Sequence, residues 1–199
     1  MNSKYLGDAF DHWKGSIIQR LETAKPRKLL EDITVVPMIT DPKCWNRQKR
    51  LVYSRLLNVK PESILGWEKE PPSSGDLFLD PDTGVYTRKS KEHITPKEIR
   101  ELLDGDPTHE RVILIYQHGA RGQSSEKRQC QLETKVSQVF DEKIDGGKPN
   151  LHAAIFNCNH AAMLFFSYSK GRIKKIETYL KKILPNDPMS KSRILILSK

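Results

Sequence analysis

Two acidic residues follow a short apolar run near the middle of the chain. The segment Asp80-Pro81-Asp82-Thr83-Gly84 comes directly after Leu77-Phe78-Leu79. In open α/β sheets, ligands bind outside the carboxyl ends of the strands, and two carboxylates there could hold a metal ion or accept protons from an amine. The same residue types also form ordinary turns. We predict a site at this position, with Asp80 and Asp82 as catalytic residues.

A second polar cluster, Gln117-His118-Gly119-Ala120-Arg121, follows the apolar run from Val112 to Tyr116. A histidine at a strand end could serve as an acid or base, and an arginine could bind phosphate. The alternative is a capping loop with an exposed histidine. Because adjacent parallel strands end at the same edge of a sheet, we expect both clusters to share one crevice, with His118 catalytic and Arg121 in contact with nucleic acid.

Lys14 lies at the edge of an apolar stripe in the first predicted helix, whose inward positions are Phe10, Trp13, Ile17 and Leu21. A lysine at such an edge either extends its ammonium group along the apolar surface to water or points into a site. The spacing does not decide between these two, and extension to water is the simpler expectation.

The C-terminal part of the chain is strongly basic. Between Ala161 and Lys199 there are nine Lys and Arg residues and only two acidic residues, Glu177 and Asp187, which gives a net charge of +7. A helix predicted there would present one row of lysines opposite its apolar stripe, namely Lys174, Lys175, Lys181 and Lys182. This row is either a solvated helix face or a contact surface for the phosphates of a nucleic acid.

Helical and strand-like apolar periods alternate along the chain. Five segments predict helices: Asp8 to Leu21, Trp45 to Leu57, Thr95 to about Asp104, Ser125 to Ile144 and Arg172 to Ile183. Six predict strands: Ile33 to Ile39, Leu77 to Leu79, Val112 to Tyr116, Leu151 to Phe156, Ala161 to Phe166 and Arg193 to Ser198. This alternation predicts one α/β domain, residues 1–199, built as a Rossmann-like three-layer sandwich whose mostly parallel sheet ends in an antiparallel C-terminal hairpin.

The composition indicates a globular, basic protein without a membrane span. The 199 residues are 37% apolar and 30% charged, and the formal net charge of +9 favours a nucleic-acid partner, RNA or DNA. No apolar stretch is long enough to cross a bilayer, and no export signal is evident, so we expect no membrane partner. Three widely spaced cysteines, Cys44, Cys130 and Cys158, are expected to be reduced thiols of a cytoplasmic protein. The glycine-rich loops that bind nucleotide phosphates and the nucleophile-elbow motif are absent from the sequence.

The segment Gly7-Asp8-x-x-Asp11-x-x-Lys14 resembles the N-terminal segment Gly-Asn-x-x-Asp-x-x-Lys of the bacterial 23S rRNA adenine-N6 methyltransferase family. Asp80-Pro81 is similar to the start of that family's Asp-Pro-Pro-Tyr motif, and the closing order of hairpin, helix and strand is similar too. Thr40-Asp41-Pro42 stand where the family has a glycine-rich loop under the cofactor, and Asp82-Thr83 replace its Pro-Tyr pair.

The resemblance implies a methyltransferase-like protein that uses S-adenosylmethionine, with Asp80 beside the acceptor amine and Lys14 and Asp41 at the cofactor. Two other functions fit the residues. One is a Mg²⁺-dependent nuclease or phosphodiesterase that holds its metal with Asp80 and Asp82 and uses His118 as the base. The other is a non-catalytic module that binds nucleic acid or protein.

Overall fold

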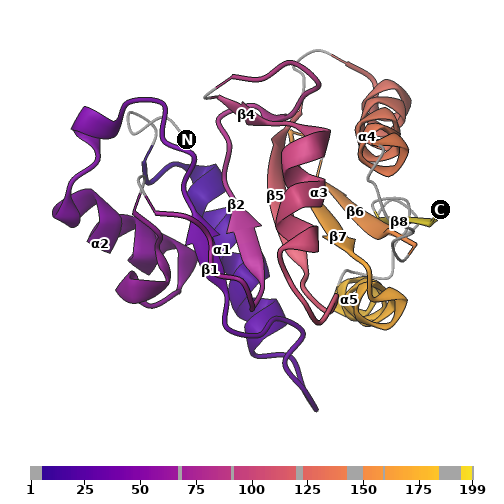
Figure 1. Cartoon of the computed structure of the whole chain (residues 1–199), viewed down its shortest axis with the longest axis horizontal. Helices are drawn as coiled ribbons and strands as arrows, with labels where there is room; N and C mark the ends of the chain where they lie inside the picture. The colour runs from indigo at the N-terminus through magenta and orange to yellow at the C-terminus, as the bar shows by residue number, and fades with distance from the viewer. Residues whose placement is uncertain are drawn as a thin grey trace.

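The computed structural model describes residues 6–66, 69–90, 92–119, 123–142, 150–158, 160–183 and 194–198. Six strands form one mixed sheet in the order β1-β2-β5-β7-β6-β8 (Figure 1). Their bounds are β1 Thr34–Val36, β2 Leu77–Leu79, β5 Ile113–His118, β6 His152–Cys158, β7 Ala161–Ser167 and β8 Ile194–Ser198. The helices are α1 Ala9–Glu22, α2 Arg47–Leu57, α3 Pro96–Asp104, α4 Ser125–Asp141 and α5 Lys170–Ile183.

The first half of the sheet is parallel and the second half is antiparallel. Strand β2 pairs in parallel with both β1 and β5, through Val35 opposite Phe78 and Phe78 opposite Leu114. Strand β7 lies antiparallel between β5 and β6, and β8 pairs antiparallel with β6. Four strands, β1, β2, β5 and β6, therefore run in the same direction, which confirms the predicted α/β class with a mostly parallel sheet and the β6–β7 hairpin.

Helices cover both faces of the sheet, because side chains along each strand alternate between its faces. On one face Phe78 and Leu114 pack among buried side chains of α1, α2 and α5. On the other face Leu77, Leu79 and Ile113 pack among those of α3 and α4. The result is the predicted three-layer arrangement (Figure 1). One apolar core lies on each side of the sheet.

Local sequence signals fix where the helices start. The Asp8 carboxylate accepts hydrogen bonds from the backbone N–H groups of Phe10 and Asp11, at 2.9 and 3.0 Å, and so caps α1 as predicted. Thr95 and Glu98 form the predicted capping box at the start of α3. The predicted end of α4 at Ile144 and the predicted start of β8 at Arg193 lie outside the described residues.

Two features differ from the expectation. The β-rich run from Ile33 to Ile39 yields only the three residues of β1, because Pro37 has no N–H to donate to a neighbouring strand. A small parallel sheet of β3, Gly84–Val85, and β4, His93–Ile94, lies beyond the end of β2 and was not predicted (Figure 1). No described helix has the length and apolar character that a membrane span requires.

Candidate functional site

A buried ion pair lies at the carboxyl edge of the sheet. The Lys14 ammonium lies 2.9 Å from Oδ1 and 3.0 Å from Oδ2 of Asp80, and 3.0 Å from Oδ1 of Asp11. Lys14 is only 4% exposed and Asp80 only 1%. The expectation that Lys14 extends to water is therefore wrong: its side chain points inward, because two carboxylates inside offer it better partners than the solvent does. We call Asp11, Lys14, Tyr53 and Asp80 the Asp80 cluster.

Helix α1 supplies two members of the Asp80 cluster through its three-residue spacing. Residues three apart lie on the same side of a helix, so Asp11 and Lys14 both face β2. The backbone N–H of Gly7 donates to Oδ2 of Asp11 at 2.8 Å, which holds this carboxylate at the start of the helix. The motif Gly7-Asp8-x-x-Asp11-x-x-Lys14 thus builds a cap and half of the ion-pair cluster at once.

Helix α2 supplies Tyr53, whose hydroxyl donates a short hydrogen bond to Oδ2 of Asp80. The helix reaches Asp80 because α1 and α2 pack very closely. A Cβ atom on Gly15 would lie 2.0 Å from the carbonyl oxygen of Leu56, so no other residue fits at this crossing without moving a helix. Gly15 is therefore the residue that lets both helices meet over the end of β2.

The carboxylates of the Asp80 cluster oppose the effect of burial on Lys14 and reinforce it on Tyr53. Burial lowers the pKa of Lys14, but the charges of Asp80 and Asp11 outweigh it, and the net effect raises the pKa. Burial, together with the Asp80 charge, also raises the pKa of the Tyr53 hydroxyl well above its ordinary value. Lys14 is thus a cation and Tyr53 a neutral donor at every physiological pH, and both bind the side chain of Asp80.

Tyr116, near the carboxyl end of β5, contacts the Asp80 cluster through Lys14. The Lys14 ammonium is 4.1 Å from the centroid of its ring, a cation–π contact. Burial raises the pKa of Tyr116, with smaller contributions from the charges of Asp80, Asp8 and Asp11. Its buried hydroxyl has no hydrogen-bond partner among the described residues, which leaves one unsatisfied polar group at this edge.

His118 lies where β5 ends, with its side chain exposed. Its ring centroid is 5.1 Å from that of Tyr116 and 5.4 Å from that of Phe10. The ring is exposed on one side only. Its partial burial against these neighbours, followed by the charge of Lys14, lowers the pKa of His118, although three carboxylates act in the opposite direction, those of Asp80, Asp8 and Asp82. The imidazole is therefore largely neutral at pH 7. The structure thus brings together the predicted residues Lys14, Asp80, Asp82 and His118.

Gln117, which precedes His118, connects two parts of the backbone at this site. Its side chain is buried, accepts a hydrogen bond from Val85 N–H at 2.8 Å and donates to the carbonyl of Thr83 at 2.8 Å. Gly84 has φ +102°, and a Cβ there would lie 2.2 Å from Gln117 Oε1. Gln117 thus connects the turn after Asp80 to β5 through two hydrogen bonds. Its role is structural, since its side chain is buried beneath the site.

The other predicted residues lie elsewhere. Asp41 is exposed, and its carboxylate accepts from Lys43 N–H at 3.2 Å and from the Cys44 thiol at 3.0 Å, at the start of the short 3₁₀ helix Pro42–Cys44. Arg121 lies outside the described residues.

The four predicted lysines of α5 are all exposed, and Lys181 forms an ion pair with Glu177. They lie on α5, which follows β7, whereas the Asp80 cluster is built by α1, α2 and the end of β2.

The magnesium alternative finds no ligand set in the described part of the chain. That part contains no group of three or more His, Cys, Asp or Glu residues that could hold a metal ion. Asp80, its first predicted ligand, is already bound by Lys14 and Tyr53.

Three residues of the site were not predicted as site residues. Asp11 is part of the quoted N-terminal motif, and Tyr116 directly precedes the Gln117-His118 pair, so both had a local signal. Tyr53 had none, because its role depends on how α2 packs. Comparison with known proteins adds no identity: no protein-family model, no curated protein and no solved structure matches the chain.

Proposed function

We propose that this chain is a Rossmann-like, methyltransferase-like protein that acts on nucleic acid and uses S-adenosylmethionine at the Asp80 cluster. The observation that carries the proposal is the contact between Lys14 and Asp80, 66 residues apart in sequence. The resemblance to the bacterial 23S rRNA adenine-N6 methyltransferase family pairs one of these residues with the cofactor and the other with the acceptor amine. Their direct contact supports that assignment.

The charge of the site fits a cationic cofactor. Four carboxylates, Asp8, Asp11, Asp80 and Asp82, act on Lys14, Tyr116 or His118 at this edge, and Lys14 is the one cation among these groups. The edge is thus locally acidic in a chain of net charge +9. S-adenosylmethionine carries a sulfonium and an ammonium group, and its sulfonium makes the attached methyl group electrophilic. Asp8 and Asp82 would face these cationic groups, and the Tyr116 hydroxyl would find a polar partner.

Within this proposal Asp80 polarises the acceptor amine. Lys14 and Tyr53 hold its carboxylate in one orientation. Each carboxylate oxygen can accept two hydrogen bonds, so Oδ1, bound only by Lys14 among the described residues, retains a lone pair for an exocyclic N–H. His118, neutral and exposed at the same edge, can accept the proton that the amine loses. Because Asp80 is 1% exposed, the side chains that cover it must move for the amine to reach it.

A second candidate function, a non-catalytic nucleic-acid-binding module, is favoured by the closure of the Asp80 cluster. Asp11, Lys14 and Asp80 are nearly inaccessible and satisfy one another, as in a purely structural ion pair. In addition, the chain after β1 forms a 3₁₀ helix starting at Pro42, where the resembled family has a glycine-rich loop. The two candidates differ in one measurable property, the binding of the cofactor.

Titration calorimetry with S-adenosylmethionine and S-adenosylhomocysteine tests the proposal. We expect saturable binding that Asp80→Asn weakens at least tenfold, because Asp80 contributes to the negative charge of the site. Asp32→Asn is the matched control: Asp32 is exposed, and asparagine tolerates its φ of +47°. The absence of heat with both compounds at millimolar concentration would remove the methyltransferase proposal and leave the binding module.

A further inference from the structure

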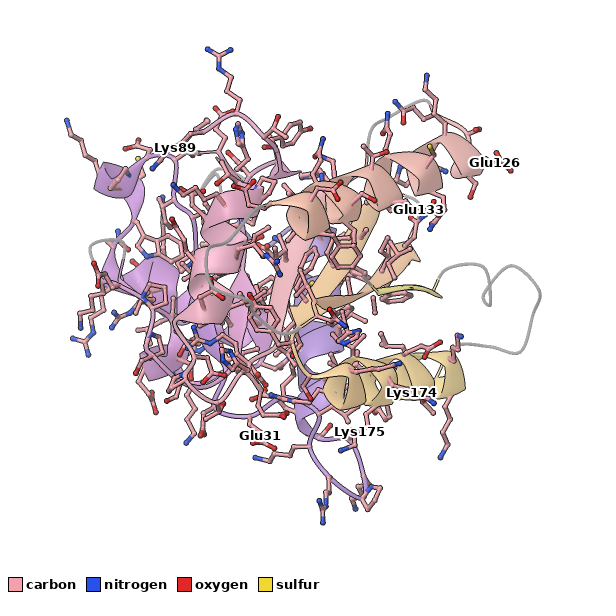
Figure 2. The ribbon with its side chains drawn as sticks, turned by 45° about the vertical axis from the view of Figure 1, so that its right-hand side comes forward. Glu31, Lys89, Glu126, Glu133, Lys174 and Lys175 are labelled. Carbon is pink, nitrogen blue, oxygen red and sulfur yellow. The ribbon has the colours of Figure 1, made fainter. Side chains whose placement is uncertain are left out.

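A large groove lies at the opposite edge of the sheet from the Asp80 cluster. It has a volume of about 890 Å³ and is lined by residues 24–29 and Glu31, between α1 and β1, and by one side of α5. Glu110, which also lines it, precedes β5, so the groove opens at the amino ends of the parallel strands. Figure 2 shows Lys174 and Lys175 on α5 and Glu31 on the neighbouring segment at this edge.

The groove is strongly basic. Only two carboxylates, Glu31 and Glu110, are among the described residues that line it. Arg172 lines it as well, but its guanidinium is already bound to the buried carboxylate of Asp76. The remaining cations are all exposed, and they come from both walls: Lys25, Arg27, Lys28, Lys174, Lys175 and Lys182.

The groove also has an apolar and aromatic part. Ala24, Leu29, Tyr179 and Ile183 line it, and Tyr179 is half-buried on the face of α5 that packs against the core. The volume is in the range of clefts that hold small organic ligands, about 300–1,000 Å³. Cations on the walls and an aromatic side chain between them match the two chemical parts of a nucleotide, its phosphate and its base.

We infer that this groove binds single-stranded nucleic acid, with phosphates on the lysine and arginine side chains and a base against Tyr179. A duplex would fit less well, because its bases stack inside the double helix and would leave the apolar part of the groove without a partner. The choice of nucleic acid over another polyanion rests on the proposed function, whose acceptor amine belongs to a nucleobase. We call this surface the α5 groove.

The α5 groove and the Asp80 cluster lie at the two ends of α1. The helix starts beside Asp11 and Lys14 and ends just before Ala24, which lines the groove. Its 14 residues span about 20 Å. A single-stranded nucleic acid held in the groove is therefore bound away from Asp80. A nucleotide further along that nucleic acid can then reach the Asp80 cluster.

Fluorescence anisotropy with a labelled single-stranded oligonucleotide and its duplex tests this inference. We expect the single strand to bind more tightly. Each neutralised phosphate of a single strand contributes about 0.7 to the slope of log affinity against log salt. Replacing Lys174, Lys175 and Lys182 with glutamine should therefore reduce that slope by about two. The matched control replaces three exposed lysines outside the groove and away from α5, Lys89, Lys97 and Lys127, and should leave the slope nearly unchanged.

The aromatic contact has its own pair of variants. Tyr179→Leu keeps an apolar side chain of similar bulk but removes the ring, and should weaken single-strand binding on the order of tenfold. Tyr179→Phe keeps the ring and should bind like the wild type. Both proteins are compared by thermal melting first, so that a loss of folding is not mistaken for a loss of binding.

The outcomes separate this inference from the proposed function. Groove-dependent binding of the single strand without cofactor binding would retain the inference and reject the methyltransferase proposal. Cofactor binding with no oligonucleotide binding at low salt would reject the inference and retain the proposal that the Asp80 cluster binds S-adenosylmethionine. Equal binding of single strand and duplex, an equal effect of both lysine triplets, or groove-dependent binding of an acidic peptide with no binding of the single strand would overturn the inference.

Discussion

Asp76 and Asp80 lie at opposite ends of β2, and both carboxylates are nearly inaccessible, at 0% and 1% exposure. Their donors differ. Asp76 accepts from two backbone N–H groups, those of Glu31 at 2.7 Å and Val112 at 2.8 Å, and from the Arg172 guanidinium at 2.7 and 2.8 Å. Among the described residues, Asp80 accepts only from side chains, those of Lys14 and Tyr53. Asp76 thus joins four separate segments of the backbone, whereas Asp80 joins two helices to the end of one strand.

The comparison shows that burial of a carboxylate does not by itself mark a site. Burial raises the pKa of Asp76, although Arg172 and the two backbone amides oppose it, and these same groups are the hydrogen-bond donors to its carboxylate. Around Asp80 the unsatisfied hydroxyl of Tyr116 and the exposed ring of His118 lie at the same edge. The kind of donor and the presence of unsatisfied neighbours distinguish a structural carboxylate from a candidate functional one.

The largest expected effect is a loss of folding stability when Asp76 is replaced. Asp76→Ala leaves the Arg172 guanidinium and two backbone amides without an acceptor, and breaking a buried ion pair costs about 3–5 kcal/mol. Asp80→Asn keeps an oxygen for Tyr53 and leaves Lys14 its second partner, Asp11, so we expect a loss of about 1–3 kcal/mol. Urea unfolding followed by tryptophan fluorescence measures both. An equal or larger loss for Asp80→Asn would show that Asp80 too is mainly structural.

A smaller effect tests whether the two ends of β2 are independent. The Lys14→Met and Asp80→Asn changes should couple by about 1–3 kcal/mol in a double-mutant cycle, since the side chains are in direct contact. The Lys14→Met and Asp76→Asn changes should add to within about 0.5 kcal/mol, because four residues of strand separate the sites by about 13 Å. The second cycle is the control for the first. Coupling in both cycles would mean that β2 transmits the perturbation and that the two ends form one unit.

The sequence predicts one part of this architecture much better than the other. Asp8 as the cap of α1, the capping box of Thr95 and Glu98, and the apolar run from Val112 to Tyr116 are local signals, and each was confirmed. Asp80 at the end of β2 was also predictable, because three apolar residues define the strand and a turn follows.

The partners of Asp80 were not predictable in the same way. Lys14 and Tyr53 lie 66 and 27 residues from Asp80, and their convergence depends on the strand order and on the close approach of α1 and α2 at Gly15. No periodicity encodes such a crossing. The same limit applies to Asp76, whose pairing with Arg172 spans 96 residues, and to β3 and β4, which are only two residues long.

The smallest expected effect compares Lys14 with Lys135, a second lysine largely withdrawn from water. The Lys135 ammonium donates to the carbonyl of Val85 and lies 3.6 Å from the centroid of the Tyr86 ring. Burial lowers the pKa of Lys135 from 10.5 to about 8, and no carboxylate of the described residues offsets the shift. Lys135 thus shows what burial alone would do to Lys14 if Asp11 and Asp80 were absent.

The two shifts give opposite dependences of stability on pH. For Lys135, the unfolded chain binds more protons than the folded chain between pH 8 and 10.5, so its cost to stability is full below pH 8 and is relieved as the pH rises through this window. For Lys14, whose pKa is raised, the contribution to stability is full below pH 10.5 and is lost only above it. The free energy of unfolding of the wild type, minus that of Lys135→Met, should therefore increase by about 1 kcal/mol between pH 8 and 10.5, an estimate that discounts the part of the side chain reached by water. The corresponding difference for Lys14→Met should stay constant over the same range. Urea unfolding at several pH values measures both differences, and a flat profile for Lys135→Met would show that its ammonium group is solvated in the folded protein.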